Sequence, residues 1–191
     1  MIYQPTHLPE HFNRDSRILG YYRLARQLAA FVETGVTALA HTVYQDFVEL
    51  VLQHPAEYLQ AQMRRLMKLA GQVAAGLFSV SAALAIPLVP LVFGPAYRPA
   101  VPLFQLMLIG VMARLVMFPS SPLHMALGNY KYLMKLNIAL APPALVALAL
   151  VCWRLGAAGA ALTVSLYIVL LNLLGTLRLR RLLQSMIRDG H

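Results

Sequence analysis

The chain has 191 residues, of which 59% are hydrophobic and 12% are charged, and its mean hydropathy is +0.63. Soluble domains carry about 25% charged residues, so this composition excludes an ordinary soluble protein and predicts an all-α, polytopic membrane protein. The net charge is +9, from 16 Lys and Arg against 7 Asp and Glu. We attribute this excess to cytoplasmic loops that face anionic lipid, and we expect no nucleic-acid partner.

The N-terminal segment MIYQPTHLPEHFNRDSR is polar and of mixed charge, unlike a secretory signal peptide. We predict a polar extracytoplasmic arm or loop over residues 1–17, followed by a helical membrane domain over 18–187. The chain has one cysteine, Cys152, which lies in a hydrophobic stretch. An internal disulfide, a cysteine-based zinc site and a thioredoxin-type motif are therefore excluded.

The first span is expected at about 18–52. Its middle, Thr34 to Gln45, contains no Asp, Glu, Lys or Arg, but three charged residues come just before it. These are Arg23, Arg26 and Glu33, and their spacings of three and seven residues put them on one face of a helix. The sequence thus predicts a charged face within or beside the first span.

The longest uncharged run covers residues 69–97, directly after three basic residues at 64, 65 and 68. Its 29 residues exceed the roughly 20 that are needed to cross a bilayer core about 30 Å thick. We predict a span over 69–93, preceded by a break at Pro55 and a short amphipathic cytoplasmic segment. Phe93-Gly94-Pro95 is expected to end this span.

Three further spans and a basic cytoplasmic tail follow, at about 99–127, 132–153, 156–177 and 178–191. Pro119-Ser120-Ser121-Pro122 must bend or break the first of them, and Pro142-Pro143 predicts a kink in the second. The last span opens with GAAGAAL, whose small residues let helices approach closely.

The distribution of basic residues orients these spans, because Lys and Arg are retained on the cytoplasmic side. With the N-terminus outside and the C-terminus inside, nine basic residues lie inside: Arg64, Arg65, Lys68, Lys131, Lys135, Arg178, Arg180, Arg181 and Arg188. Four lie outside: Arg14, Arg17, Arg98 and Arg154. We predict a multi-pass protein of the cell inner (plasma) membrane. Five spans with an outer N-terminus and no signal peptide are what the C-terminal part of a larger transporter would have.

Four segments together resemble a known family. They are ILGYYRLARQLA at 18–29, IPLVPLVFGPAYRPAVPLFQLM at 86–107, ALGNYKYLMKLNIAL at 126–140 and RLGAAGAALTVSLYIVLLN at 154–172. In this order and spacing they resemble the polysaccharide (O-antigen and exopolysaccharide) flippases of the multidrug/oligosaccharidyl-lipid/polysaccharide exporter superfamily. The resemblance covers about residues 18–185.

Proteins of that family consist of two similar halves around a central cavity, and this chain looks like only the last five spans. The resemblance implies a flippase portion that moves undecaprenyl-pyrophosphate-linked sugar units across the inner membrane for cell-surface polysaccharide biosynthesis, such as lipopolysaccharide O-antigen. It implies no enzymatic activity and no cofactor. The expected partners are membrane lipid, the lipid-linked oligosaccharide, and either the N-terminal half or a second copy of the chain.

Arg23, Arg26, Glu33 and Arg114 are the candidate residues for a substrate-binding cavity. Ionisable side chains within spans are costly and usually face a cavity or one another. A guanidinium group suits a pyrophosphate or an acidic sugar, since it presents a planar fork of donors. Two structural alternatives stay open: Arg23 and Arg26 could extend to the outer interface, and Arg114 could form an ion pair with Glu33.

The other polar residues predict structural roles. Ser165, Asn172 and Thr176 share one face of the last helix, which favours hydrogen bonds between helices. His124 is expected to be a satisfied structural side chain. No Ser/His/Asp set, metal-spaced His/Cys cluster or glycine-rich phosphate loop occurs in the sequence, so we predict no catalytic residues and no metal site.

Two other functions are compatible with the sequence. A cation-coupled drug antiporter would need acidic residues in the bundle, and Glu33 is the only candidate. From a different class, the chain could be a non-transporting membrane scaffold or a truncated remnant in a polysaccharide assembly complex. The shortness of the chain favours this second alternative, whereas the arginines within spans favour transport.

Overall fold

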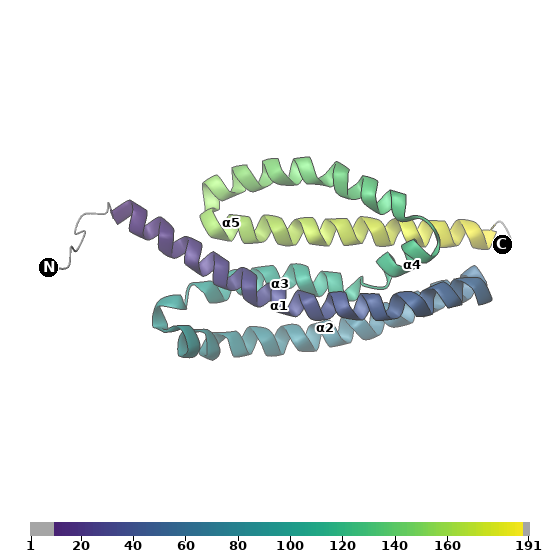
Figure 1. Ribbon diagram of the computed structural model, residues 1–191, viewed down its shortest axis with the longest axis horizontal. Helices are drawn as coiled ribbons and strands as arrows, with labels where there is room; N and C mark the ends of the chain where they lie inside the picture. The colour runs from purple at the N-terminus through teal and green to yellow at the C-terminus, as the bar shows by residue number, and fades with distance from the viewer. Residues whose placement is uncertain (1–9, 189–191) are drawn as a thin grey trace.

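The computed structural model of the protein describes residues 10–188, without the side chains of residues 10–16, 36 and 39–45. Within this range the chain forms helices and no strand, which confirms the all-α prediction. The elements are α1 (Glu10–Gln53), α2 (Ala56–Phe93), the short 3-10 helix η1 (Pro95–Tyr97), α3 (Ala100–Val116), α4 (Ser120–Ala126) and α5 (Tyr130–Arg188), shown in Figure 1.

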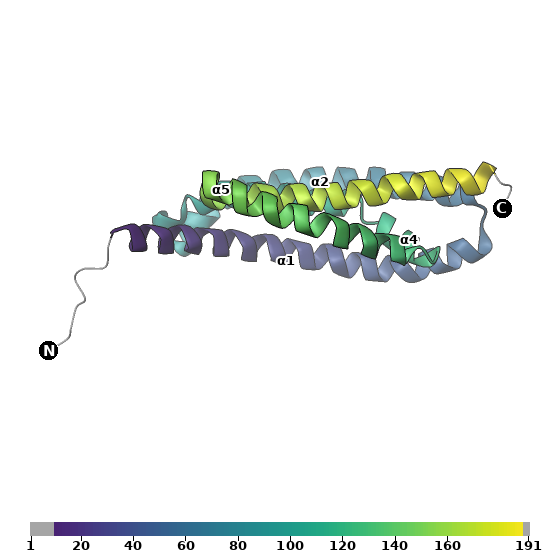
Figure 2. The same ribbon diagram turned by 90° about the horizontal axis from the view of Figure 1, so that it is seen from above.

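The helices lie roughly along one long axis, and the beginning of α1 and the end of α5 lie at opposite ends of the bundle (Figures 1 and 2). The central helix is α3, which packs against α1, α2 and α5. Nine of its 17 residues are buried, because it is apolar on most of its circumference. A second, smaller core joins α1, α2, α4 and α5 through Phe47, Leu59, Met63, Leu123, Leu179 and Leu183.

The first helix begins earlier than the sequence suggested. We expected a polar arm up to residue 17, but α1 already begins at Glu10. No proline or glycine occurs between Glu10 and Leu19, so nothing interrupts the helix there, although the segment is polar. The remaining part of the expected arm, residues 1–9, lies outside the described residues.

Proline and glycine residues separate α2 from its neighbours. Pro55 precedes α2 in an extended conformation, as its fixed φ angle allows at a helix start. The helix continues through Pro87 and Pro90 and ends at Phe93. Gly94 then has a φ of 95°, a conformation that a side chain would strain, and η1 turns the chain towards α3.

The Pro119-Ser120-Ser121-Pro122 run lies at a bend, as predicted. The axes of α3 and α4 differ by 41°, and the three residues between the two helices, Met117 to Pro119, form a turn. Pro119 and Ser120 are both buried in this bend. The Ser120 hydroxyl and the Ser120 backbone N–H both donate to the Met117 carbonyl oxygen, at 2.8 Å and 3.1 Å, which closes the turn between α3 and α4.

The fifth helix consists of two arms that fold back on each other at Gly156, where φ is 58° and ψ is −138°. The arms approach closely, since a Cβ atom on Gly159 would lie 2.5 Å from the Val151 carbonyl oxygen. Within α5 only Gly156 leaves helical dihedral angles. The arm that contains Pro142-Pro143 is a smooth arch in Figure 1, so the sharp break comes from glycine and not from the two prolines.

Two helices of the described chain, α2 and α5, are long and apolar enough to cross a membrane. The bent pair of α3 and α4 passes the same test when it is taken as one span, which raises the number to three. Only 11% and 22% of the residues in the most apolar stretches of α2 and α5 are buried inside the protein. Such exposed apolar surface is stable in lipid and unstable in water, which indicates a membrane protein.

Candidate functional site

The carboxylate of Glu33 joins α1 to α3. One of its oxygens, Oε2, lies 3.4 Å from Arg26 Nη1, two turns earlier on the same helix. The other oxygen, Oε1, accepts a hydrogen bond from Nη1 of Arg114 on α3. Glu33 therefore bridges two guanidinium groups, and we call Arg26, Glu33 and Arg114 the ion-pair cluster.

Local helix geometry creates half of this cluster. A separation of seven residues is about two helical turns, so Arg26 and Glu33 lie on one face of α1. The same turn of α1 carries a further hydrogen bond, in which the Thr37 hydroxyl donates to the Glu33 carbonyl oxygen at 3.0 Å. The other half depends on tertiary packing, because Arg114 reaches Glu33 only where α3 packs against α1.

The cluster carries more positive than negative charge. Two guanidinium groups and one carboxylate have a formal sum of +1. The Glu33 side chain is 20% exposed, whereas those of Arg26 and Arg114 are 47% and 40% exposed. Each guanidinium group has five N–H donors, so both keep donors that Glu33 does not occupy. The cluster can therefore accept a further anion from its exposed side.

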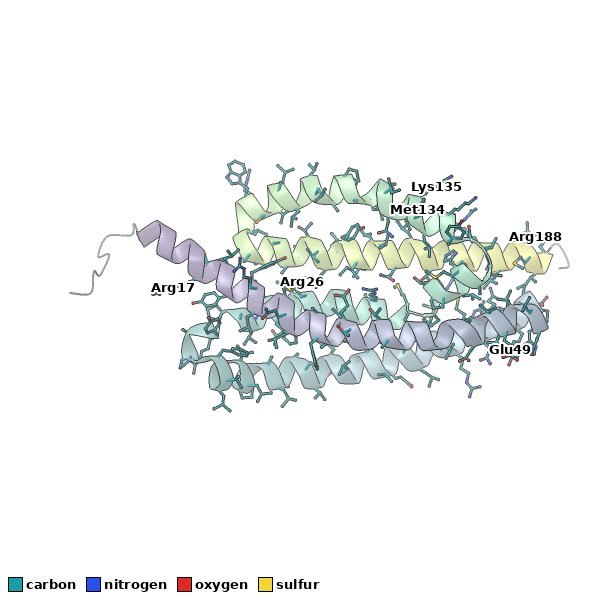
Figure 3. All side chains as sticks on the ribbon, viewed as in Figure 1. Arg17, Arg26, Glu49, Met134, Lys135 and Arg188 are labelled. Carbon is teal, nitrogen blue, oxygen red and sulfur yellow. The ribbon has the colours of Figure 1, made fainter. Side chains whose placement is uncertain are left out.

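Arg23 lies one turn before Arg26 on the same helix and is exposed. No ion pair connects it to another described side chain. Figure 3 shows Arg26 on α1 between the labelled Arg17 and Glu49, towards the Arg17 end of the bundle. The charged face predicted on the first helix is therefore present, but only two of its three members take part in the cluster.

The position of Arg114 along the bundle follows from its register with α2. The Gln105 side-chain amide donates to the Ala82 carbonyl oxygen at 3.2 Å, which fixes the level of α3 against the antiparallel α2. Continuing this register puts Arg114 opposite about Val73. The uncharged run of α2 begins at Leu69, so Arg114 lies about 6 Å inside it, at a rise of 1.5 Å per residue.

Of the four candidate residues, the structure thus brings three together and leaves Arg23 outside the ion pairs of the described residues. The alternative in which Arg114 pairs with Glu33 is the contact that we observe. Contact of any of the four residues with a substrate stays a prediction. The sequence could not rank the alternatives, because residues 33 and 114 are 81 positions apart and their pairing depends on how two helices cross.

Interhelical hydrogen bonding by the polar face of the last helix is confirmed for one residue. Ser165 donates to the Leu106 carbonyl oxygen on α3 at 2.7 Å, where Gly110 lets the two helices touch. Asn172 instead donates to Ile168 of its own helix. The Thr176 hydroxyl is buried and has no hydrogen-bond partner within the described part of the chain.

His124 is fully buried and both of its ring nitrogens are occupied, as the structural role predicts. Nε2 lies 2.9 Å from the Gly175 carbonyl oxygen, which can only accept, so Nε2 carries the proton and donates. Nδ1 lies 3.3 Å from the Asn129 amide nitrogen and accepts. Tyr132 stacks on the imidazole ring and Arg178 lies over Tyr132. The sequence did not reveal this cluster, although Asn129 and His124 are near neighbours.

No group of three or more His, Cys, Asp or Glu side chains in the described residues could hold a metal ion. No protein family, no curated protein and no solved structure matches this chain.

Proposed function

We propose that this chain is the C-terminal portion of a lipid-linked oligosaccharide flippase, in which the ion-pair cluster contacts the pyrophosphate of the lipid carrier. The observation that carries the proposal is the Glu33 carboxylate that holds two arginines between α1 and α3 with an excess of positive charge. Charged groups at membrane depth are costly and mark substrate pathways. The proposed substrate class comes from the four segments that resemble polysaccharide flippases.

The proposal includes five membrane crossings. They are α1, α2, the bent pair of α3 and α4, and the two arms of α5 on either side of Gly156. Each arm of α5 has more than 25 residues, or more than about 37 Å of helix, which is longer than the apolar core of a bilayer. The beginning of α1 and the end of α5 lie at opposite ends of the bundle in Figure 1, which supports an odd number of crossings.

In this proposal Glu33 holds the guanidinium groups in place. Its two oxygens occupy one N–H group of each arginine and leave the other donors directed elsewhere. A pyrophosphate has several oxygens and could accept these donors from Arg26 and Arg114 together, in the bidentate geometry that guanidinium groups favour. Arg23, one turn away, would add a third positive charge.

The two alternative functions, a drug antiporter and a scaffold, require different roles of Glu33. A cation-coupled drug antiporter needs a carboxylate that is free to bind a proton or cation, and Glu33 is already bound to two guanidinium groups. A scaffold would need the ion pair only to fasten α1 to α3. The exposed apolar faces of α2 and α5 suit further helices, and this holds for a scaffold as well as for half of a transporter.

Binding to the full-length chain in liposomes of neutral lipid tests the proposal. The probe is a fluorescent undecaprenyl-pyrophosphate-linked sugar, and the matched control probe carries the same lipid and sugar without phosphate. We expect the first probe to bind and the second to fail. Arg26→Gln and Arg114→Gln should each weaken binding about tenfold, since each removes charge-assisted hydrogen bonds, and Arg98→Gln should leave it unchanged.

Equal binding of the two probes, or unchanged binding in both cluster variants, would reject a pyrophosphate site. Transport is a separate measurement. The chain by itself should fail to move the probe between leaflets, because alternating access normally needs a second half to rock against. Transport by the isolated chain would show that it is not one half of a transporter.

A further inference from the structure

A second cationic cluster lies at the other side of α3. A groove of about 500 Å3 is lined mainly by residues from the beginning of α2 and the end of α5. These two segments lie at the same end of the bundle (Figure 1). Its lining residues come from α2, the end of α3 and α5: Gln60, Arg64, Met67, Lys68, Val116, Arg180 and Gln184. We call this the α2–α5 groove.

Helix periodicity explains why these side chains line one groove. The four lining residues of α2, at positions 60, 64, 67 and 68, lie on one face of that helix because residues three or four apart are neighbours. Arg180 and Gln184 are four residues apart and lie on one face of α5 for the same reason. The residues that precede three of them, Met63, Leu179 and Leu183, are buried together in the second core. The apolar contact between α2 and α5 therefore lies next to the groove and holds its two walls together.

The groove is distinct from the ion-pair cluster. Val116 lines the groove, and Arg114 of the cluster comes two residues earlier on α3. Two residues correspond to about 200° around a helix, so the two side chains leave α3 on nearly opposite faces. The ion-pair cluster also contains α1, whereas no residue of α1 lines the groove.

The charges in the groove are all of one sign. Arg64, Lys68 and Arg180 contribute three positive charges, and no acidic residue is among the lining residues. None of these three basic residues forms an ion pair with a described side chain. Like charges on facing helices repel one another, so a bound anion would relieve a cost that the helices otherwise carry. Gln60 and Gln184 add amide donors, and the set suits an anion with several oxygens, such as a phosphate.

The surroundings of the groove favour a lipid over a free ion. Met67 and Val116 contribute apolar surface to the same groove. Lys68 is the last charged residue before the uncharged run of α2, and Leu69 and Val73 at the start of that run are exposed. The basic side chains therefore lie where the headgroup region of a bilayer meets its apolar core. We propose that the α2–α5 groove binds the phosphate headgroup of an anionic phospholipid, with its acyl chains along α2.

Two neighbouring arginines provide a matched control for this proposal. Arg65 and Arg181 directly follow Arg64 and Arg180, lie at the same level of the bundle and are exposed, but they do not line the groove. General attraction between basic residues and anionic lipid depends on charge and depth, so it would treat the two pairs alike. A binding site in the groove would distinguish them.

The experiment measures equilibrium binding of radiolabelled dioctanoyl phosphatidate to the full-length chain in a neutral detergent, at constant ionic strength. We expect saturable binding that Arg64→Gln/Arg180→Gln weakens about tenfold or more, because two charge-assisted contacts are lost. Arg65→Gln/Arg181→Gln should change the dissociation constant by less than about twofold. Lys68→Gln, which leaves both arginines and the second core intact, should also weaken binding. This single variant therefore tests the proposal even if the double variant folds poorly.

Equal weakening by both double variants would overturn the proposal in favour of diffuse surface charge. Unlabelled dioctanoylglycerol, which lacks the phosphate, should not displace the probe, and displacement by it would show that apolar contact alone explains binding. Displacement by inorganic phosphate at the same concentration as unlabelled phosphatidate would show a site for free phosphate and would overturn the lipid proposal. If neither Lys68→Gln nor Arg64→Gln/Arg180→Gln changed binding, the groove would be excluded as the binding site.

Discussion

Arg114 of α3 donates a hydrogen bond to Glu33 of α1, although the two residues are 81 positions apart in the chain. This contact is the link between the helix with the most charged residues and the central helix of the bundle. Both residues are partly buried, and in a membrane the surroundings of the remaining exposed atoms are poorer in water than they would be on a soluble protein. Loss of either charge should therefore matter for the stability of the bundle as well as for any ligand.

Replacement of Glu33 by Gln should destabilise the protein. Arg26 and Arg114 would keep their charges but lose the carboxylate between them, and we expect a loss of about 2 kcal/mol, between the values for exposed and buried ion pairs. The measurement is the free energy of unfolding in mixed micelles of neutral detergent and dodecyl sulfate. Glu33→Gln/Arg114→Gln should be less destabilised than the sum of its single variants, since the two groups form one contact. If the losses in the free energy of unfolding were additive, the contact between Glu33 and Arg114 would not contribute to stability.

The flippase proposal predicts a loss of export beyond any loss of folded protein. In a transporter assembled with its other half, Arg26→Gln and Arg114→Gln should lower export per folded transporter, because fewer donors remain for the pyrophosphate. Lys at either position should restore only part of the rate, since an ammonium group cannot form the bidentate contact. Arg98→Gln, beside η1, is the control and should export normally because its charge is exposed. Wild-type export by both cluster variants would remove these arginines from the mechanism.

The predicted orientation can be tested with single cysteines in a Cys152→Ser background. Gln60→Cys at the beginning of α2 and Ser185→Cys near the end of α5 should be inaccessible to an impermeant thiol reagent in intact cells. We expect both positions on the cytoplasmic side because basic residues are in excess near them. Ala96→Cys in the exposed η1 turn should react, and it shows that the reagent is active. Labelling of positions 60 and 185 but not 96 would invert the topology.

The close packing of α3 against α5 predicts that Gly110→Ala destabilises the protein, and Gly76→Ala in α2 provides the control. A Cβ atom on Gly110 would lie 2.9 Å from the Cα atom of Ser165, so Gly110→Ala should push the helices apart and cost about 1–3 kcal/mol. A Cβ atom on Gly76 in α2 would meet no atom within 4 Å. Gly76→Ala should therefore be neutral or stabilise the helix by up to about 1 kcal/mol. Unfolding in mixed micelles measures both, and equal effects would contradict the close approach at Gly110.

The sequence by itself determined that the chain is helical and belongs in a membrane. Uncharged runs of sufficient length decide this locally, because in lipid each backbone N–H and C=O group must find its partner within its own helix. The same local rules placed the ends of α2 at Pro55 and Gly94 and the bend before α4 at Pro119. These rules did not predict the beginning of α1. The segment from Glu10 to Arg17 is polar enough for a loop, but it is equally compatible with a helix.

Only the tertiary structure decided which charged residues meet. Spacing within one helix put Arg26 on the face of Glu33, but the rotation of α3 about its own axis turned Arg114 towards that face and Val116 towards the other side. Arg64 and Arg180 line one groove because Met63 and Leu179 pack beside them, whereas their neighbours Arg65 and Arg181 stay outside it. Hydropathy specifies how deeply a residue lies in the membrane, but contacts between helices depend on the shape and packing of side chains far apart in the sequence.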